Sequence, residues 1–306
     1  MILTYRALDS DAGRSTLSIL RRELQLSAAA VRRLRQSDAI CVNGRSAFTT
    51  ERLDPGEVVT ADLLKAEPKS DLAPEQGDID VLYEDEGLIA VNKPAGLLTH
   101  PSRARFTGTL ANFVAWYLLQ SSGVPYCHAV NRLDRDTSGV LLFAKNSYMK
   151  ALACAALAMP DAEKEYIALV FGVPEPGKGI IDLPIIRLRE GDMMRGVSPD
   201  GKRAVTRFET LGSLAVSGDS ISLIKVRPET GRTHQIRVHF SAIGNPVLGD
   251  GLYGSERSRA VSEGLAITTQ ALHARRLVFA HPLSGERIEV TAAPPPLFKF
   301  VFDTQY

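Results

Sequence analysis

The order of hydrophobic runs along the chain limits the architectures it can adopt, because strand-like runs outnumber helix-like ones and rarely alternate with them. Short apolar or alternating runs predict strands at residues 40–42, 81–83, 88–91, 140–144, 166–170, 207–211, 220–226, 272–278 and 287–290. Helical spacing predicts two short helices within residues 17–34 and single helices at 109–120, at 147–159 with Ser147 as N-cap, and at 233–243. A doubly wound parallel sheet requires regular alternation, so the pattern predicts an α+β fold with a mainly antiparallel sheet.

A polar stretch divides the chain into a short and a long part. Residues 66–78 carry two prolines and lack hydrophobic periodicity, which is typical of a linker. A chain of 306 residues is long enough for about two domains. We therefore expect a small N-terminal domain over residues 1–65, a linker over 66–78 and a larger domain over 79–306.

Composition excludes several classes of protein. The chain is 44% hydrophobic and 23% charged, as in ordinary soluble globular proteins, and its net charge of +1 gives no general attraction to nucleic acid. Cys41, Cys127 and Cys154 are odd in number and lack the C-x-x-C spacing, which argues against a disulfide framework or a thiolate zinc site. The first residues form no apolar signal segment, and no run is long enough to span a bilayer. We therefore expect a cytoplasmic protein.

Any affinity for RNA must come from local clusters of positive charge. Residues 27–47 contain four arginines, Arg32, Arg33, Arg35 and Arg45, against one aspartate, a local charge of +3. Such a patch can contact phosphates. The alternative is that these arginines only solvate a helix face, and composition leaves both interpretations open.

The loop expected before the strand at 140–144 concentrates reactive side chains. Residues 131–139, NRLDRDTSG, carry two arginines, two carboxylates and two hydroxyls. Arginines beside an aspartate such as Asp134 can keep its carboxylate ionised, and an ionised carboxylate is a usable nucleophile for a glycosidic carbon. The alternative is a turn in which Asp136, Thr137 and Ser138 bind backbone donors. The loop alone decides neither.

A second segment, residues 227–239, is strongly basic. Together with Lys225, two residues before it, the segment holds Arg227, Arg232 and Arg237 against the single acid Glu229. On the helix expected here, His234 and Arg237 lie on one stripe, next to the face that packs into the core. An arginine at such an edge can pair with a buried carboxylate from elsewhere in the fold.

These segments resemble the RluA-type RNA pseudouridine synthases. Residues 131–139 are similar to the family's signature loop, normally His-Arg-Leu-Asp followed by a Thr-Ser-Gly ending. The family's other blocks are similar, in the same order, to residues 91–102, 164–172, 227–240 and 249–254. The resemblance covers residues 80–295, and the N-terminal segment more loosely resembles the αL-type RNA-binding module.

The resemblance implies a mixed sheet with a central catalytic cleft, and it assigns roles to individual residues. Asp134 corresponds to the catalytic aspartate, Tyr166 to the aromatic residue that packs on the target base, and Arg237 to the partner of Asp134. Arg132 is expected to hold or replace the flipped nucleotide. Tyr166 is also a candidate for orienting the base or assisting removal of the C5 proton.

Further expectations follow for the substrate side of the site. Arg232 and His234, in the same block as Arg237, are expected to bind substrate. One departure stands at Asn131, where the family usually has histidine; we interpret it as a tolerated structural change. Asp134 is expected to attack C1′, stabilise positive charge there or assist proton removal at the sugar, and the sequence does not choose among these routes.

The chemistry implied by the resemblance needs no cofactor. Exchanging an N1 for a C5 glycosidic bond requires no redox step, metal ion or nucleotide energy, and the six histidines show no paired metal-ligand spacing. Gly249-Asp250-Gly251 matches no phosphate-loop pattern. We therefore expect a monomeric isomerase that acts on structured ribosomal or transfer RNA, with no metal, no nucleotide cofactor and no membrane partner.

Two rival functions remain open at this point. A catalytically silent RNA-binding or ribosome-assembly protein would fit Asn131 and the basic N-terminal patch. An N-glycoside hydrolase would use the same carboxylate to release the base instead of rejoining it. The presence of Asp134, Tyr166 and Arg237 together favours the synthase.

Overall fold

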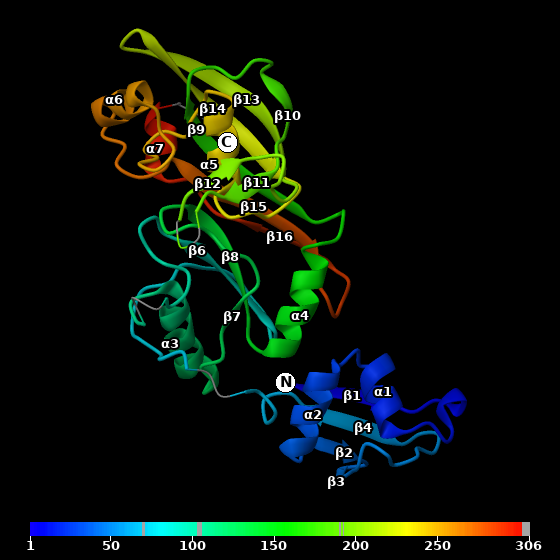
Figure 1. Cartoon of the computed structure of the whole chain (residues 1–306). Helices are drawn as coiled ribbons and strands as arrows, with labels where there is room; N and C mark the ends of the chain where they lie inside the picture. Colours follow the sequence, from blue (N-terminus) through cyan, green and yellow to red (C-terminus); the bar gives the residue numbers. More distant parts are fainter. Residues whose placement is uncertain (69–70, 103–105, 190, 192, 302–306) are drawn as a thin grey trace.

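A computed structural model describes residues 1–68, 71–102, 106–189, 191 and 193–301 of the chain. Its strands form a four-stranded sheet, a ten-stranded sheet and a two-stranded sheet (Figure 1). The four-stranded sheet contains β1 (Ile2–Arg6), β2 (Ile40–Val42), β3 (Arg45–Ser46) and β4 (Val58–Asp62). The ten-stranded sheet contains β5 (Val81–Glu84), β6 (Leu88–Lys93), β7 (His128–Ala129), β8 (Ser138–Ala144), β9 (Glu163–Phe171), β10 (Lys178–Asp182), β13 (Val205–Val216), β14 (Asp219–Pro228), β15 (Leu272–Ala280) and β16 (Arg287–Thr291). The two-stranded sheet pairs β11 (Ile185–Arg187) with β12 (Arg195–Val197).

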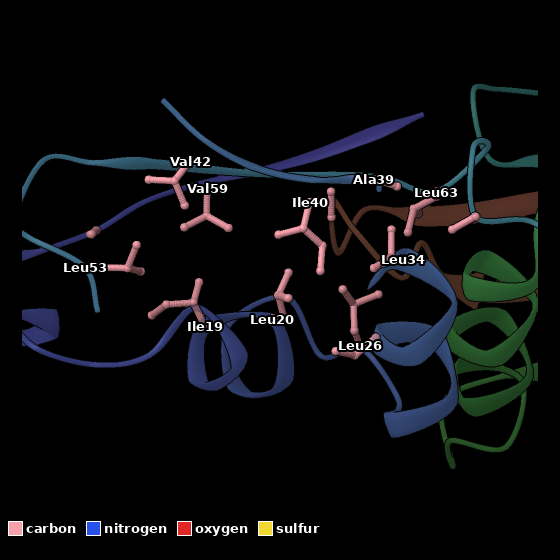
Figure 2. Close-up of a cluster of buried hydrophobic side chains, with 14 residues drawn as sticks. Ile19, Leu20, Leu26, Leu34, Ala39, Ile40, Val42, Leu53, Val59 and Leu63 are labelled. Carbon is pink, nitrogen blue, oxygen red and sulfur yellow. The ribbon is translucent and has the colours of Figure 1, made fainter. Parts of the chain in front are cut away.

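The N-terminal part has a hydrophobic core of its own. Its sheet has the strand order β1-β4-β2-β3, and α1 (Thr16–Arg22) and α2 (Ala28–Gln36) pack on one face of it. Ser15 and Ser27 cap these two helices by accepting the backbone N–H groups of Ser18 and Ala30. Figure 2 shows the side chains that meet between helices and sheet, among them Ile19, Leu20, Leu26, Leu34, Ile40, Val42, Leu53 and Val59.

The large sheet is mixed but mainly antiparallel. Its strand order is β10-β13-β14-β9-β15-β8-β6-β5, with β16 paired to β15 and β7 to β8. The strand pairs are antiparallel except β15 and β8, which run parallel where His273 faces Ser138 and Ala274 faces Gly139. This architecture confirms the α+β fold predicted from the order of strand-like runs.

Helices cover both faces of the large sheet, so its central strands are buried on both sides. On β6 and β8, one set of alternate residues packs against α3 (Leu110–Ser122) and the other against α4 (Ser147–Ala156). Further along the sheet, α5 (Gln235–Ala242) covers one face, and α6 (Glu256–Gly264) and α7 (Pro296–Val301) cover the other. This explains why β8 is a continuous apolar run.

One local prediction was wrong. The N-cap of α4 is Asn146, whose Oδ1 accepts the backbone N–H of Met149, and Ser147 is the first helical residue. Asparagine and serine are equally good caps, so the sequence alone does not separate two such neighbours.

The segment predicted to be a linker, residues 66–78, contains no helix or strand in its described part. It is nevertheless tied to α3, because Asn112 donates to the carbonyl of Ala73 at 2.7 Å and accepts from the N–H of Glu75 through its own carbonyl at 3.1 Å. A direct hydrogen bond also joins the parts before and after this segment: the Tyr148 hydroxyl of α4 donates to the carbonyl of Leu24 at 3.0 Å. The N-terminal part is therefore in contact with the rest of the molecule.

Gly139 lies at the parallel junction of the large sheet, where β8 pairs with β15. Gly139 has φ +109°, and a Cβ there would lie 2.2 Å from the carbonyl oxygen of Ala274. Gly139→Ala is therefore expected to lower the free energy of unfolding by about 3 kcal/mol, from backbone strain and overpacking together, in urea denaturation.

The matched control for this change is Gly123→Ala. Gly123 also has a positive φ of +75°, but no atom lies within 4 Å of the place that an added Cβ would occupy. We expect this change to cost about 1 kcal/mol, from backbone strain alone. Equal losses in the two variants would contradict a close contact at the junction.

Candidate active site

The loop between β7 and β8 carries Asp134 and is fixed at its start by Asn131. The Asn131 Oδ1 accepts the backbone N–H of Leu142 in β8 at 2.8 Å, and the neighbouring Val130 N–H donates to the Leu142 carbonyl at 2.8 Å. Asn131 thus holds the loop to the strand it precedes. This contact gives the residue a structural role, in line with the interpretation from the sequence.

The other side of the loop is held by a buried lysine. The ammonium group of Lys93, at the end of β6, donates to the carbonyls of Pro94 (2.9 Å), Leu97 (2.7 Å) and Arg135 (2.6 Å). The side chain is completely buried, and this burial lowers the pKa of Lys93 to about 8, although the negative charges of Asp136 and Asp134 oppose the shift. Lys93 therefore ties two loops together with all three of its donors.

Asp134 shares the guanidinium of Arg237 with a second carboxylate. Arg237 Nη1 donates to Asp134 Oδ2 at 3.0 Å, while Nε and Nη2 donate to the two oxygens of Asp250 at 2.6 and 2.8 Å. The Asp250 side chain is fully buried and that of Asp134 is 26% exposed. Asp250 also accepts the N–H groups of Leu252 and Tyr253. The bidentate pair therefore anchors Arg237, and Arg237 then orients Asp134 at the open side.

His234 lies next to this group at the N-cap of α5, in the left-handed region with φ 58°. Its Nε2 is 4.0 Å from Asp134 Oδ2, and its Nδ1 is 2.8 Å from the Tyr253 hydroxyl, which accepts the backbone N–H of Arg195. Burial lowers the pKa of His234, and the positive charges of Arg237 and Arg195 lower it further, against the opposing charge of Asp134. His234 is thus mainly neutral at neutral pH.

A cleft of about 890 Å³ opens in front of these residues. Asp134, Tyr166 and Arg237 line it, from the β7–β8 loop, from β9 and from α5. Arg132, Arg232 and His234 also line it. The structure therefore brings all six site residues named from the sequence to a single cavity.

Tyr166 presents a protonated phenol to the cleft. Burial raises the pKa of Tyr166 to about 12, and the negative charge of Asp134 adds to the shift. At neutral pH the hydroxyl is therefore a hydrogen-bond donor and a weak acid. The residue is half-buried and lines the cleft from β9.

Two further residues of the site were missed from the sequence. Asp250 lies in the block GDGLYG, which matches no phosphate loop, and its spacing from Arg237 follows no helical or strand period. Lys93 lies in the block at residues 91–102, but lysines are rarely fully buried, so the pattern gives no reason to place it inside. The resemblance of both blocks to the family was the one signal that pointed to them.

The described residues also limit what else the chain can hold. Among them, no group of three or more His, Cys, Asp and Glu side chains is placed to bind a metal ion. In the same part of the chain, no helix combines the length and the apolar character needed to cross a bilayer.

Comparison with known proteins identifies the family. Residues 87–242 match the family model for RNA pseudouridylate synthase. The uncharacterized RNA pseudouridine synthase YhcT of Bacillus subtilis is 37% identical over 284 residues, which cover 93% of this chain and 90% of the relative. Ribosomal large subunit pseudouridine synthase D of Zymomonas mobilis is 37% identical over 237 residues, which cover 75% of this chain and 73% of the relative.

A solved structure has the same fold over most of its length. Human RNA pseudouridylate synthase domain containing 1 superposes with a TM-score of 0.58 at 28% sequence identity, covering 75% of this chain and 86% of that one. Family model, relatives and fold agree with the blocks recognised in the sequence. The chain therefore belongs to the RNA pseudouridylate synthase family, is of the RluA type, and is an isomerase.

Proposed function

We propose that this chain converts uridine to pseudouridine in structured ribosomal RNA, with Asp134 as the catalytic residue. The observation that carries the proposal is the Asp134 carboxylate at the cleft, held through one oxygen by an arginine that a buried carboxylate already anchors. The named relative that acts on the large ribosomal subunit supports ribosomal RNA as the substrate class. A cytoplasmic location and a monomeric state stay predictions from the sequence.

Asp134 supplies a negative charge where the sugar reacts. The N1–C1′ bond breaks, the base turns, and a C5–C1′ bond forms; the C5 proton leaves and N1 gains a proton, so atoms balance. Asp134 Oδ2 is bound by Arg237, while no described residue donates a hydrogen bond to Oδ1. That oxygen is free to act at C1′ or at the sugar, and each of these routes requires the ionised carboxylate.

Tyr166 and Arg132 handle the flipped nucleotide. Extruding a base from a structured RNA costs a few kcal/mol, which stacking on an aromatic ring offsets. Tyr166 offers that ring, and its protonated phenol orients the base by donating a hydrogen bond. Arg132, Arg232 and His234 contribute the polar contacts at the cleft wall. Of these, Arg132 forms no ion pair with a described carboxylate, so its charge is available for a phosphate.

We further propose that residues 1–65 form an RNA-binding domain and residues 79–306 the catalytic domain, joined by the segment 66–78. The exposed face of α2 presents Arg32 and Arg35, one helical turn apart. Neither forms an ion pair with a carboxylate in the described part of the chain, so both are open to phosphate.

The substrate class is tested by mapping pseudouridine in ribosomal and transfer RNA from cells with and without the chain. We expect one or more uridines of large-subunit ribosomal RNA to lose the modification in its absence. Loss confined to transfer RNA would overturn the ribosomal assignment while leaving the reaction intact.

The reaction itself is tested at Asp134. Asp134→Asn keeps the shape and one acceptor for Arg237, so unfolding should change by about 1 kcal/mol, but turnover should fall by about 10³-fold or more with RNA binding retained. The measurement is tritium release from C5-labelled uridine RNA under single-turnover conditions. Asp161→Asn, an exposed aspartate, is the control. Turnover at the wild-type rate in Asp134→Asn would contradict the proposed role of Asp134. Free uracil in the product would indicate hydrolysis of the glycosidic bond instead of isomerisation.

Arg237→Ala should differ from Asp134→Asn in stability. It leaves the buried Asp250 carboxylate without its guanidinium, a change that typically costs about 3–5 kcal/mol. The carboxylate left unpaired in the interior is Asp250, because Asp134 is partly exposed. Thermal melts should show this loss beside an exposed control, Arg259→Ala. A melt like that of Asp134→Asn would contradict the anchoring role of Asp250.

A change at Tyr166 separates stacking from hydrogen bonding. Tyr166→Phe keeps the ring, so RNA affinity should be unchanged, while loss of one hydrogen bond should slow turnover by about ten-fold. Because the pKa of Tyr166 is raised to about 12, the wild-type rate should show no limb from its ionisation between about pH 6 and pH 9. Equal single-turnover rates for both proteins would reduce Tyr166 to packing.

The role of the N-terminal domain is tested on α2. The double variant Arg32→Ala/Arg35→Ala removes two exposed charges from this helix, so the slope of log affinity against log salt should fall by about one to two. Filter binding of ribosomal RNA over a range of salt concentrations measures this, with Arg259→Ala as the control. An unchanged slope would show that α2 does not contact phosphates.

A further inference from the structure

A buried carboxylate lies where the N-terminal domain meets the catalytic domain. The Glu67 side chain is 2% exposed, directly after the last turn of the N-terminal part. Its Oε1 is 2.8 Å from His128 Nε2, its two oxygens accept the N–H of Ser147 at 3.0 and 3.1 Å, and Oε2 accepts the Ser147 hydroxyl at 2.9 Å. A buried carboxylate is tolerated only when it is hydrogen-bonded in this way.

The contacts of Glu67 join three elements. Ser147 is the first residue of α4, where a helix N-terminus favours a negative charge. The Ser147 hydroxyl also accepts from Arg33 Nη2 of α2 at 3.1 Å. His128 belongs to β7, the strand that leads directly into the loop of Asp134. Figure 2 shows α4, in green, beside α2 at this boundary.

This network fixes the domains in one relative position. The segment that follows Glu67 has no helix or strand in its described part, and such a segment alone would allow many placements of the domain. The Glu67 network and the bond from Tyr148 to the Leu24 carbonyl remove that freedom. The exposed arginines of α2 are thereby held at a constant separation from the cleft.

We propose that Glu67 is a specificity-determining, positioning residue: it locks the N-terminal domain onto α4 and β7, so that the enzyme selects RNAs whose backbone reaches Arg32 and Arg35 while the target uridine enters the cleft. The inference rests on the proposed function of both domains. A rigid connection raises the effective concentration of the second contact for RNAs that can reach both sites at once. It does not strengthen the binding of RNAs that cannot.

The Glu67 carboxylate itself does not titrate in the neutral range. Burial opposes ionisation of Glu67, but the hydrogen bonds from His128 and Ser147 outweigh it and lower the pKa of Glu67 below its ordinary value. A lowered pKa means that its stabilising effect is complete above the pKa of the unfolded chain and is lost only as the pH falls through the folded value. Glu67 therefore stays ionised at neutral pH.

The test compares two RNAs in single-turnover and steady-state assays. One is in vitro transcribed large-subunit ribosomal RNA, which can reach both domains, and the other is a stem-loop of about 20 nucleotides around the modified uridine, which fills only the cleft. Glu67→Gln removes the charge at nearly constant shape, and Ser147→Ala removes only the hydroxyl that bridges Glu67 and Arg33. Glu263→Gln, an exposed glutamate, is the control.

For both lock variants we expect KM on the long RNA to rise by about three- to ten-fold with kcat unchanged, and both constants on the stem-loop to stay at wild-type values. The radius of gyration from small-angle scattering should increase, since the domain is released. If Glu67→Gln folds poorly in thermal melts, the milder Ser147→Ala carries the same comparison.

Two results would overturn the inference. Equal losses on both RNAs would mean that Glu67 only supports the fold or the Asp134 loop, and unchanged constants on both would mean that the lock does not select RNA. Failure of the proposed function is recognised separately: if Arg32→Ala/Arg35→Ala leaves KM on the long RNA unchanged, α2 does not bind RNA, and the inference falls with it.

Discussion

The guanidinium of Arg237 is the charge around which the site is arranged. Asp250 neutralises it from the interior with two hydrogen bonds, and Asp134 receives the remaining contact from the side that faces the cleft. The Tyr253 ring lies 5.0 Å from the guanidinium carbon and completes its surroundings. Because Asp250 is bonded independently of substrate, Arg237 holds Asp134 in place before an RNA arrives. For the reaction proposed at Asp134, preorganisation of this kind avoids the cost of reorienting charges.

The large sheet explains how residues distant in sequence reach this arginine. One row of paired residues crosses its centre: Val226 in β14 faces Tyr166 in β9, Tyr166 faces Ala274 in β15, and Ala274 faces Gly139 in β8. The loop of Asp134 ends as β8 begins, and the segment leading to α5 starts where β14 ends. Both therefore emerge beside the tyrosine of the central row. The parallel contact of β15 with β8 is needed for this arrangement. Because β15 also pairs with β9, it places the Asp134 loop, which ends where β8 begins, one strand away from Tyr166.

Hydrophobic patterns in the sequence predicted individual helices and strands. They did not predict contacts between residues that are far apart in the sequence. The apolar run of β8 and the apolar residues of α3 identify those elements because each buries many apolar residues within one short stretch of sequence. The short strands β11 and β12 have no such pattern, since each spans only three residues and Ile185 alone among the six is buried. The pairing of Arg237 with Asp250 and the burial of Lys93 depend on long-range placement, which hydrophobic periodicity does not encode. The resemblance to the family supplied Asp134, Tyr166 and Arg237, and the structure then placed them in one cavity.

The departure from the family at Asn131 is explained by what its side chain does. The Asn131 oxygen accepts the backbone N–H of Leu142, two residues beyond the start of the apolar core of β8, so it replaces one bond of the sheet ladder. Any side chain with an acceptor at that distance can fill the same role, and a neutral histidine has one. The substitution therefore changes a contact with the backbone and leaves the bond of Asp134 to Arg237 untouched. The hypothesis of a silent RNA-binding protein rests partly on Asn131; with the residue assigned to the backbone of β8, that reason for doubting catalysis disappears.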